Sequence, residues 1–155
     1  MPDVLAQRVY EWERDVVEPK SLNFLSREEC LELAGRAALF LGIPAPSLRI
    51  SKAASMPCRA IPSKWQIVIA GWGRTPVTLL HEVAHLGSLK AVAKGENPHG
   101  PAFVATAIAL YARFLGLDAA KLSDSARQYG VGVGTQAFGP VDRTARVPDF
   151  SDLEF

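Results

Sequence analysis

The sequence predicts an α+β fold, in which a small antiparallel or mixed sheet packs against a helix spanning His81–His85 and against further helices. Three observations support this expectation. Several segments carry apolar residues at helical spacing, and two short segments rich in β-formers precede His81. The chain has 155 residues, of which 48% are apolar and 21% charged, as in an ordinary globular domain. We expect one domain over residues 1–133 and an extended tail over residues 134–155.

Two helices are expected before the first strand. The first runs from Asp3 to about Val17 and is ended by Pro19, with apolar residues at helical spacing: Leu5, Val9, Trp12 and Val16. The second begins at a capping box of Ser26 and Glu29. Its apolar side comprises Leu33, Ala37, Phe40 and Leu41, and it is followed by the helix-breaking residues Gly42, Pro44 and Pro46.

Two strands, a loop and a turn should follow. Ser47–Ser51 alternates apolar and polar residues, which suits a short strand. Trp65–Ala70 holds the strongest run of β-formers in the chain and predicts a second strand. Residues 53–64 contain prolines and small residues and are expected to form a loop, and Gly71–Gly73 a turn.

Three helices are expected in the remainder of the domain. Thr75 and Pro76 are suited to the N-cap and first position of a helix that should run to about Val92. Two more helices should follow a short loop: an almost wholly apolar one over residues 99–116 and a shorter one over Ala119–Tyr129.

Charge is unevenly distributed along the chain. The formal net charge of +1 gives no overall attraction to nucleic acid or to a membrane. Residues 3–32 are mainly acidic, whereas residues 33–81 contain six cations and no acid: Arg36, Arg49, Lys52, Arg59, Lys64 and Arg74. Segment 49–74 is therefore a candidate surface for DNA association. The wide spacing of its cations favours the alternative, an ordinary solvated surface balanced by the acidic helices.

The N-terminal sequence and the cysteines indicate a cytoplasmic protein without a membrane partner. The first residues lack the basic start and apolar core of a signal peptide, and the longest apolar stretch, Ala102–Ala112, is too short to cross a bilayer. Cys30 and Cys58 are far apart and form no Cys-x-x-Cys pair. Both are expected to be reduced, packed side chains.

The three histidines of the chain fall into one metal-ligand pattern: His81, His85 and His99. Residues four apart share a helix face, so His81 and His85 can present two nitrogens to one ion, and His99 completes three ligands. Three protein ligands leave one tetrahedral position open, as in catalytic zinc sites. One Zn²⁺ per chain is therefore the expected cofactor. Glu96 is the alternative third ligand.

Glu82 lies next to His81 and is the expected catalytic general base. A zinc ion lowers the pKa of its bound water to about 7, and the Glu82 carboxylate would accept the proton and pass it to the leaving amine. Asp118 and Asp124 are candidates for orienting the ligand histidines, as are backbone carbonyls.

The two histidine motifs resemble those of a known family. His81-Glu-Val-Ala-His85, a spacer of thirteen residues and His99-Gly-Pro-Ala-Phe103 are similar to the SprT-like domain of Spartan-type DNA–protein crosslink proteases and their short bacterial and phage relatives. The resemblance covers residues 65–115 and, more loosely, the helices before them. It implies a zincin-like fold, three histidine zinc ligands, catalytic Glu82 and hydrolysis of peptide bonds. The cysteine zinc ribbon that usually follows the Spartan-type protease domain has no counterpart in this sequence.

A zincin-like site further implies residues that contact a protein or peptide substrate. Extended peptides bind along a sheet edge, so the strand over 65–70 is expected to line the cleft, although an ordinary core strand would have the same sequence. The candidates are Trp65, Ile67, Ile69 and, at the cleft mouth, Trp72. Arg127 and Tyr129 are candidates for stabilising the oxyanion.

Two other functions fit the same motif. A nucleic-acid-associated or regulatory protein with a zincin scaffold would bind metal and DNA without hydrolysing peptides. A repressor-cleaving peptidase similar to the ImmA/IrrE group would share His-Glu-x-x-His but use an acidic third ligand, for which Glu96 is the candidate. The leading interpretation is a zinc-dependent endopeptidase.

Overall fold

A computed structural model describes residues 3–20, 23–52 and 57–135 and confirms the α+β class. The helices of this described part are α1 (Val4–Trp12), α2 (Arg27–Leu41), α3 (Pro76–Gly87), α4 (Leu89–Ala93), α5 (Pro101–Leu115) and α6 (Ala119–Gln128). Its strands are β1 (Ser47–Ser51), β2 (Arg59–Ile61) and β3 (Gln66–Ala70). Of the predicted tail, residues 136–155 lie outside the described residues. Gly134 is held against α5, because its N–H donates to the carbonyl of Pro101 over 3.0 Å.

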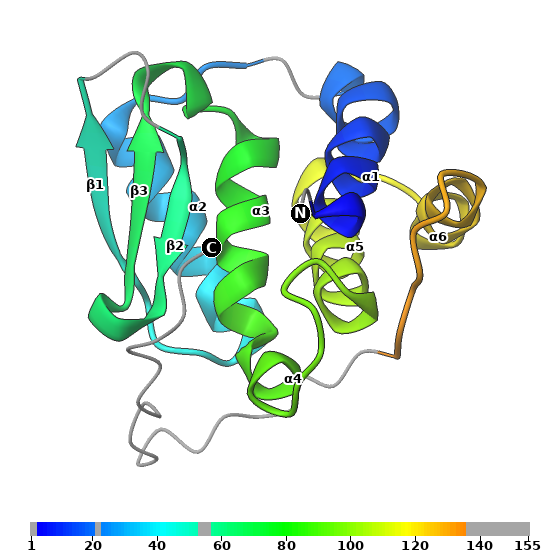
Figure 1. Cartoon of the computed structure of the whole chain (residues 1–155). Helices are drawn as coiled ribbons and strands as arrows, with labels where there is room; N and C mark the ends of the chain where they lie inside the picture. Colours follow the sequence, from blue (N-terminus) through cyan, green and yellow to red (C-terminus); the bar gives the residue numbers. More distant parts are fainter. Residues whose placement is uncertain (1–2, 21–22, 53–56, 136–155) are drawn as a thin grey trace.

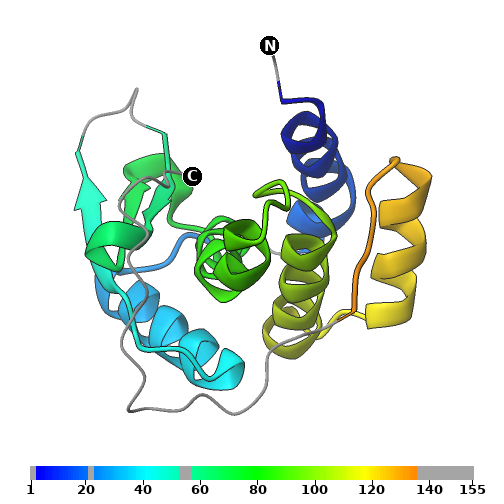
Figure 2. The same ribbon diagram turned by 60° about the horizontal axis from the view of Figure 1, so that its bottom comes forward.

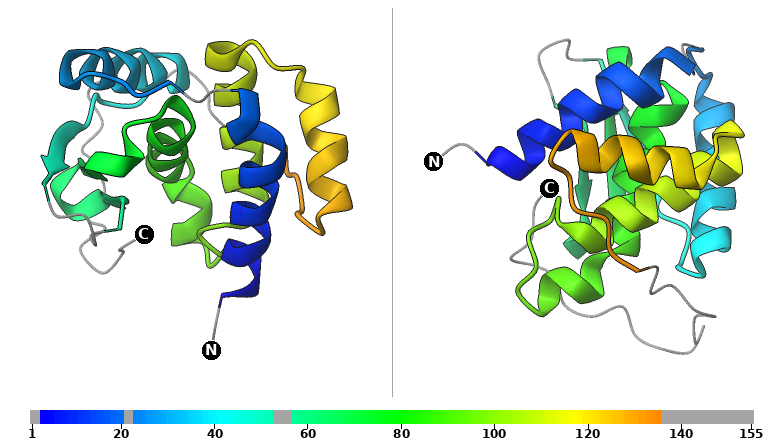
Figure 3. Two further views of the ribbon diagram at one scale, coloured as in Figure 1. Left: turned by 90° about the horizontal axis from the view of Figure 1, so that it is seen from above. Right: turned by 90° about the vertical axis from the view of Figure 1, so that its right-hand side faces the viewer.

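Helix α3 lies in the middle of the molecule. The sheet packs on one side of it, and α5, α1 and α6 form the other side (Figure 1). Helix α2 runs behind the sheet and α3 in Figure 1 and appears below them in the turned view of Figure 2. The view from above shows the succession from the sheet to α3, α5 and α6 (Figure 3). The residues that the sequence assigns to chemistry therefore lie on the central helix.

The sheet is mixed, and its strand order is β1-β3-β2. Strand β1 pairs with β3 in parallel, and β2 pairs with it antiparallel. The expectation of a loop over residues 53–64 is wrong for Arg59–Ile61, because this short segment is held as a strand by its ladder with β3. A 3₁₀ turn over Pro62–Lys64 then reverses the chain, and Trp65 occupies the left-handed region at φ 46°. Strand β3 consequently begins at Gln66.

The first helix changes its geometry after Trp12. Residues Val4–Trp12 are α-helical, Glu13–Val17 form a π-helical turn, and a 3₁₀ turn follows over Glu18–Lys20. The prediction of one regular helix to Val17 is therefore wrong in its last turn. The wider turn begins at Glu13, which is buried beside Trp12 and Val17. π-turns inside helices recur at functional sites.

Helix α2 begins and ends as predicted. Ser26 and Glu29 form the capping box, and Gly42 ends the helix in the left-handed region at φ 70°. Small buried residues such as Ala34 and Ala37 face the core, whereas Phe40 is 39% exposed. The small alanine side chains allow α3 to approach α2 closely. At Gly87 a Cβ atom would lie 2.6 Å from a methyl carbon of Leu41, so glycine permits this contact.

Helix α3 has the predicted start but an earlier end. The Thr75 hydroxyl accepts the Thr78 N–H over 3.3 Å, and Pro76 takes the first helical position. The predicted continuation to Val92 is interrupted at Ser88, whose hydroxyl donates to the Ala84 carbonyl over 2.9 Å. A serine that bonds back to the preceding turn competes with regular helix geometry.

Helix α5 is buried along most of its length, as its apolar sequence predicts, and Gly116 ends it at φ 68°. None of the described helices is both long and apolar enough to cross a membrane. Cys30 is buried and Cys58 partly buried, and neither forms a disulfide.

Candidate metal centre

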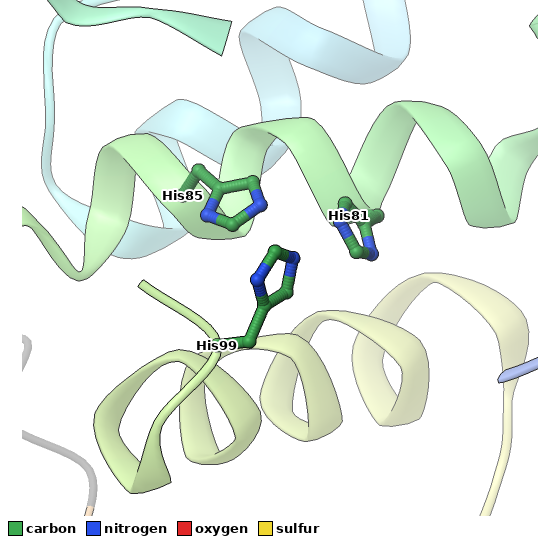
Figure 4. A group of neighbouring side chains, drawn as sticks. All are labelled: His81, His85 and His99. Atoms are coloured by element: carbon green, nitrogen blue, oxygen red, sulfur yellow. The ribbon is translucent and has the colours of Figure 1, made fainter. Parts of the chain in front are cut away.

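The three histidines converge in the interior. His81 and His85 project from α3, and His99 faces them from the segment that leads into α5 (Figure 4). Each residue offers a ring nitrogen, and these nitrogens all lie within 4.8 Å of one another. The three residues are at most 7% exposed. This arrangement could hold a metal ion.

A local network fixes the segment that carries His99. The backbone N–H of His99 donates to the side chain of Asn97 over 2.8 Å. The Glu96 carboxylate accepts the Ala102 N–H over 2.6 Å and thereby caps α5, since Gly100 has no side chain to do so. A Cβ atom at Gly100 would lie 2.9 Å from the Asn97 carbonyl oxygen, so this loop needs glycine there for its own close packing.

The cap role bears on the identity of the third ligand. Among the described residues, the histidine, cysteine and carboxylate groups close enough to share an ion are those of His81, His85 and His99, without Glu96. The Glu96 carboxylate is instead engaged with the N-terminus of α5. The geometry therefore favours His99 over Glu96.

The buried ring of Phe103 packs against all three imidazoles. Its ring stacks on His85 at 4.4 Å between centroids and meets His81 at 4.9 Å and His99 at 5.1 Å. Phe103 is 1% exposed. Since α5 begins at Pro101, the His99 motif places its aromatic residue in the first turn of the helix and against all three rings.

Glu13 orients His81. Both carboxylate oxygens of Glu13 lie 2.8 Å from Nδ1 of His81, and the Tyr111 hydroxyl donates a short hydrogen bond to the same carboxylate. A carboxylate on Nδ1 fixes the ring and leaves Nε2 for a metal. The π-turn of the first helix and the core of α5 thus meet behind the first ligand.

The three histidines differ in pKa because their surroundings differ. Burial lowers the pKa of His81, but the charge of Glu13 and the hydrogen bond to it outweigh this effect and raise the pKa to about 9. Burial and the charge of His81 lower the pKa of His99 to about 4 and that of His85 well below its ordinary value. His85 and His99 are therefore neutral near pH 7, the form that coordinates metals.

Glu82 lies beside the histidines on the side of the sheet. It is 5% exposed, and the backbone N–H of Ala60 in β2 bonds to its carboxylate. Burial raises the pKa of Glu82 to about 7, helped by the charge of Glu13 and opposed by His81 and the bond from Ala60. A carboxylate with this pKa can accept and release a proton near neutrality.

Three buried atoms at the centre make no hydrogen bond within the described part of the chain: Oε2 of Glu82 and both ring nitrogens of His99, of which Nδ1 lies 4.0 Å from a carboxylate oxygen of Asp3. Buried polar atoms normally have partners. Three imidazoles with an unpaired nitrogen among them match the ligand preferences of first-row metals such as zinc. The residues present therefore fit a metal ion, with Glu82 beside the ligands.

The predicted substrate residues are only partly placed for that role. Ile67 and Ile69 are fully buried core residues, and Trp65 donates its indole N–H to the Pro44 carbonyl over 2.8 Å. Strand β3 lies between β1 and β2, so the prediction that it offers a free edge to a peptide is wrong. Trp72 is 56% exposed and remains accessible.

The predicted oxyanion and orienting residues lie elsewhere. Arg127 pairs with Asp124 at the surface over 3.3 Å, and the Tyr129 hydroxyl donates to Asp15 over 3.0 Å. Asp118 caps α6, which packs against α5 and α1. These assignments are wrong because α6 covers the far side of α5, and Glu13 takes the orienting role.

The cations of the basic segment differ in their exposure to solvent. Arg49, Lys52 and Lys64 are exposed, whereas Arg59 is half-buried. Arg74 donates to the Gly71 carbonyl over 3.4 Å. Arg49 and Arg59 lie opposite the same residue of β3, Val68, so these two cations share one row of the sheet. DNA association through segment 49–74 stays a prediction.

Sequence reasoning missed Glu13, Tyr111 and Tyr10. Tyr10 stacks on His81 at 5.6 Å between ring centroids and meets His99 edge-on at 5.3 Å. One signal was available for Glu13, since it lies four residues after Val9 and so on the apolar side of its helix. An acid in that position is costly unless it is paired.

Comparison with protein-family models, with curated proteins and with solved structures finds no match to this chain. The function of the chain is therefore inferred from the geometry of the site and from the two histidine motifs.

Proposed function

We propose that the chain is a zinc-dependent metallohydrolase, and specifically an endopeptidase of SprT-like type with a zincin-like fold. The observation that carries this proposal is the convergence of three buried imidazoles beside Glu82. Three ligands of this kind suit a catalytic rather than a closed structural site.

The proposed chemistry assigns a distinct part to each residue. His81, His85 and His99 would hold the ion through ring nitrogens, and Glu13 would keep His81 in the orientation that exposes Nε2. Bound there, zinc would supply a positive charge that acidifies a coordinated water and polarises the scissile carbonyl. Glu82 would accept the proton of the attacking water and deliver it to the departing amine.

The state of Glu82 supports this assignment. Its raised pKa of about 7 gives both protonation states near neutral pH, and the bond from Ala60 fixes its position relative to α3. The carboxylate can thus act first as a base and then as an acid without moving far.

The decisive experiment replaces Glu82 with glutamine. Glu82→Gln is expected to keep the fold and one zinc per chain but to lower peptide hydrolysis by about 10³-fold or more, because only the proton carrier is lost. Zinc content, circular dichroism and cleavage of a fluorogenic peptide library measure the three effects. Full proteolysis by Glu82→Gln, or no zinc in the wild-type protein after zinc is supplied, would contradict the proposal.

A further inference from the structure

We infer that Tyr10 is a catalytic residue whose hydroxyl donates a hydrogen bond to the oxyanion that forms as a peptide carbonyl is attacked. This inference rests on the proposed hydrolase function and adds a residue to it. It starts from an unusual placement, because Tyr10 is 52% exposed and yet its ring contacts two of the three candidate ligands, His81 and His99.

The ring of Tyr10 lies against the centre and is itself partly open to solvent. It stacks on His81 with 27° between the planes and meets His99 edge-on with 70° between the planes. Phe103 covers the same imidazoles from the buried side and is 1% exposed. Of these two aromatic rings, that of Tyr10 is the one a substrate could meet from solvent.

Tyr10 and Glu82 lie on opposite sides of the histidines. Glu82 is bonded to Ala60 of the sheet, whereas Tyr10 belongs to α1, which packs on the other side of α3 (Figure 1). A peptide carbonyl held between them has the base on one side and a phenol on the other. Acyl-transfer sites need such a donor at the position where negative charge develops.

Helix α1 holds Tyr10 firmly for this purpose. Tyr10 precedes Glu13 by three residues, so both project from the same side of the helix, and the Glu13 carboxylate is anchored to His81 and Tyr111. The other two tyrosines of the chain are occupied, Tyr111 by Glu13 and Tyr129 by Asp15. No described residue is seen to hydrogen-bond the Tyr10 hydroxyl, and Tyr10 is 52% exposed.

The test compares Tyr10→Phe with the wild-type full chain loaded with zinc. The variant keeps the ring on His81 and His99 and removes only the hydroxyl. We expect an unchanged zinc content, a nearly unchanged KM and a kcat lowered by about 10²-fold. Affinity for a phosphinic peptide, whose tetrahedral oxygens imitate the oxyanion, should fall by a similar factor in calorimetry, a measurement that needs no turnover.

Tyr129→Phe is the matched control, because it likewise removes only a hydroxyl. Tyr129 lies at the end of α6, and its hydroxyl is hydrogen-bonded to Asp15. It should leave kcat and phosphinic affinity unchanged. Wild-type values for both quantities in Tyr10→Phe would overturn the inference alone, as would a rise in KM with kcat unchanged. A zinc-loaded wild-type protein that neither cleaves peptides nor binds the phosphinic peptide would overturn the proposed function and, with it, this inference.

Discussion

At the scale of single residues, the candidate centre is a set of groups whose properties depend on their neighbours. Glu13 raises the pKa of His81 to about 9, and burial raises that of Glu82 to about 7. Both ring nitrogens of His99 are buried without a hydrogen-bond partner among the described residues. The residue that connects these effects is Glu13, because it touches His81 directly and its charge reaches Glu82.

Replacing Glu13 should weaken metal binding without removing a ligand. In Glu13→Gln the side chain keeps its size but loses the charge that holds Nδ1 of His81, and zinc affinity is expected to fall about 10- to 100-fold. Competition with a chromophoric chelator measures the dissociation constant. Asp124→Asn is the control, since Asp124 pairs with Arg127 at the surface. Equal zinc affinity in Glu13→Gln and wild type would show that the carboxylate does not orient the ligand.

At the scale of elements, the site is assembled from the starts and interruptions of helices. Helix α3 carries two histidines four residues apart, the π-turn after α1 carries Glu13, and the capped start of α5 carries His99 and Phe103. Strand β2 adds its Ala60 N–H. Each helix brings one part because its buried side faces α3.

Two substitutions near the start of α5 should distinguish the helix cap, Glu96, from the metal ligand, His99. Glu96→Ala should keep one zinc per chain and lose about 1 kcal/mol of unfolding free energy, because it removes a cap to the Ala102 N–H. His99→Ala should lose most of the zinc. Metal analysis and urea denaturation of the two variants measure these outcomes. Zinc lost from Glu96→Ala and retained by His99→Ala would instead assign the third ligand to Glu96, as in the regulatory peptidases considered above.

At the scale of the whole molecule, the centre lies where the two halves meet. The sheet and α2 pack on one side of α3, and α5, α1 and α6 on the other (Figure 3). His81 and His85 belong to the shared helix, whereas His99 belongs to the second half. An ion held by all three would therefore join the halves of the fold.

Zinc should consequently stabilise the protein against heat. With free zinc at one hundred times its dissociation constant, the folded state gains about 2.7 kcal/mol, and the melting temperature should rise by about 5–10 °C. Differential scanning calorimetry with and without a chelator measures the shift. His99→Ala should show little or no rise. An equal rise in His99→Ala would mean that zinc binds elsewhere.

Local patterns predicted a large part of this fold. The capping box of Ser26 and Glu29, the start of α3 at Thr75 and the glycine stops at Gly42 and Gly116 follow from short-range hydrogen bonds and backbone preferences. The spacing of His81 and His85 placed two nitrogens on one helix side for the same reason. Such features need only neighbouring residues, so the sequence alone contains them.

Tertiary structure decided the features that depend on distant partners. Strand β2 exists because β3 pairs with it, and β3 lost its predicted role because both its edges are used. Glu13 contacts His81 across 68 positions of sequence, and Tyr10 contacts the same histidine across 71. Helix α6 and Tyr129 pack on another part of the molecule. The sequence by itself therefore determined the α+β class, most element boundaries and the three histidines with Glu82. Only packing decided what surrounds them, because contacts between remote segments leave no fixed spacing in the chain.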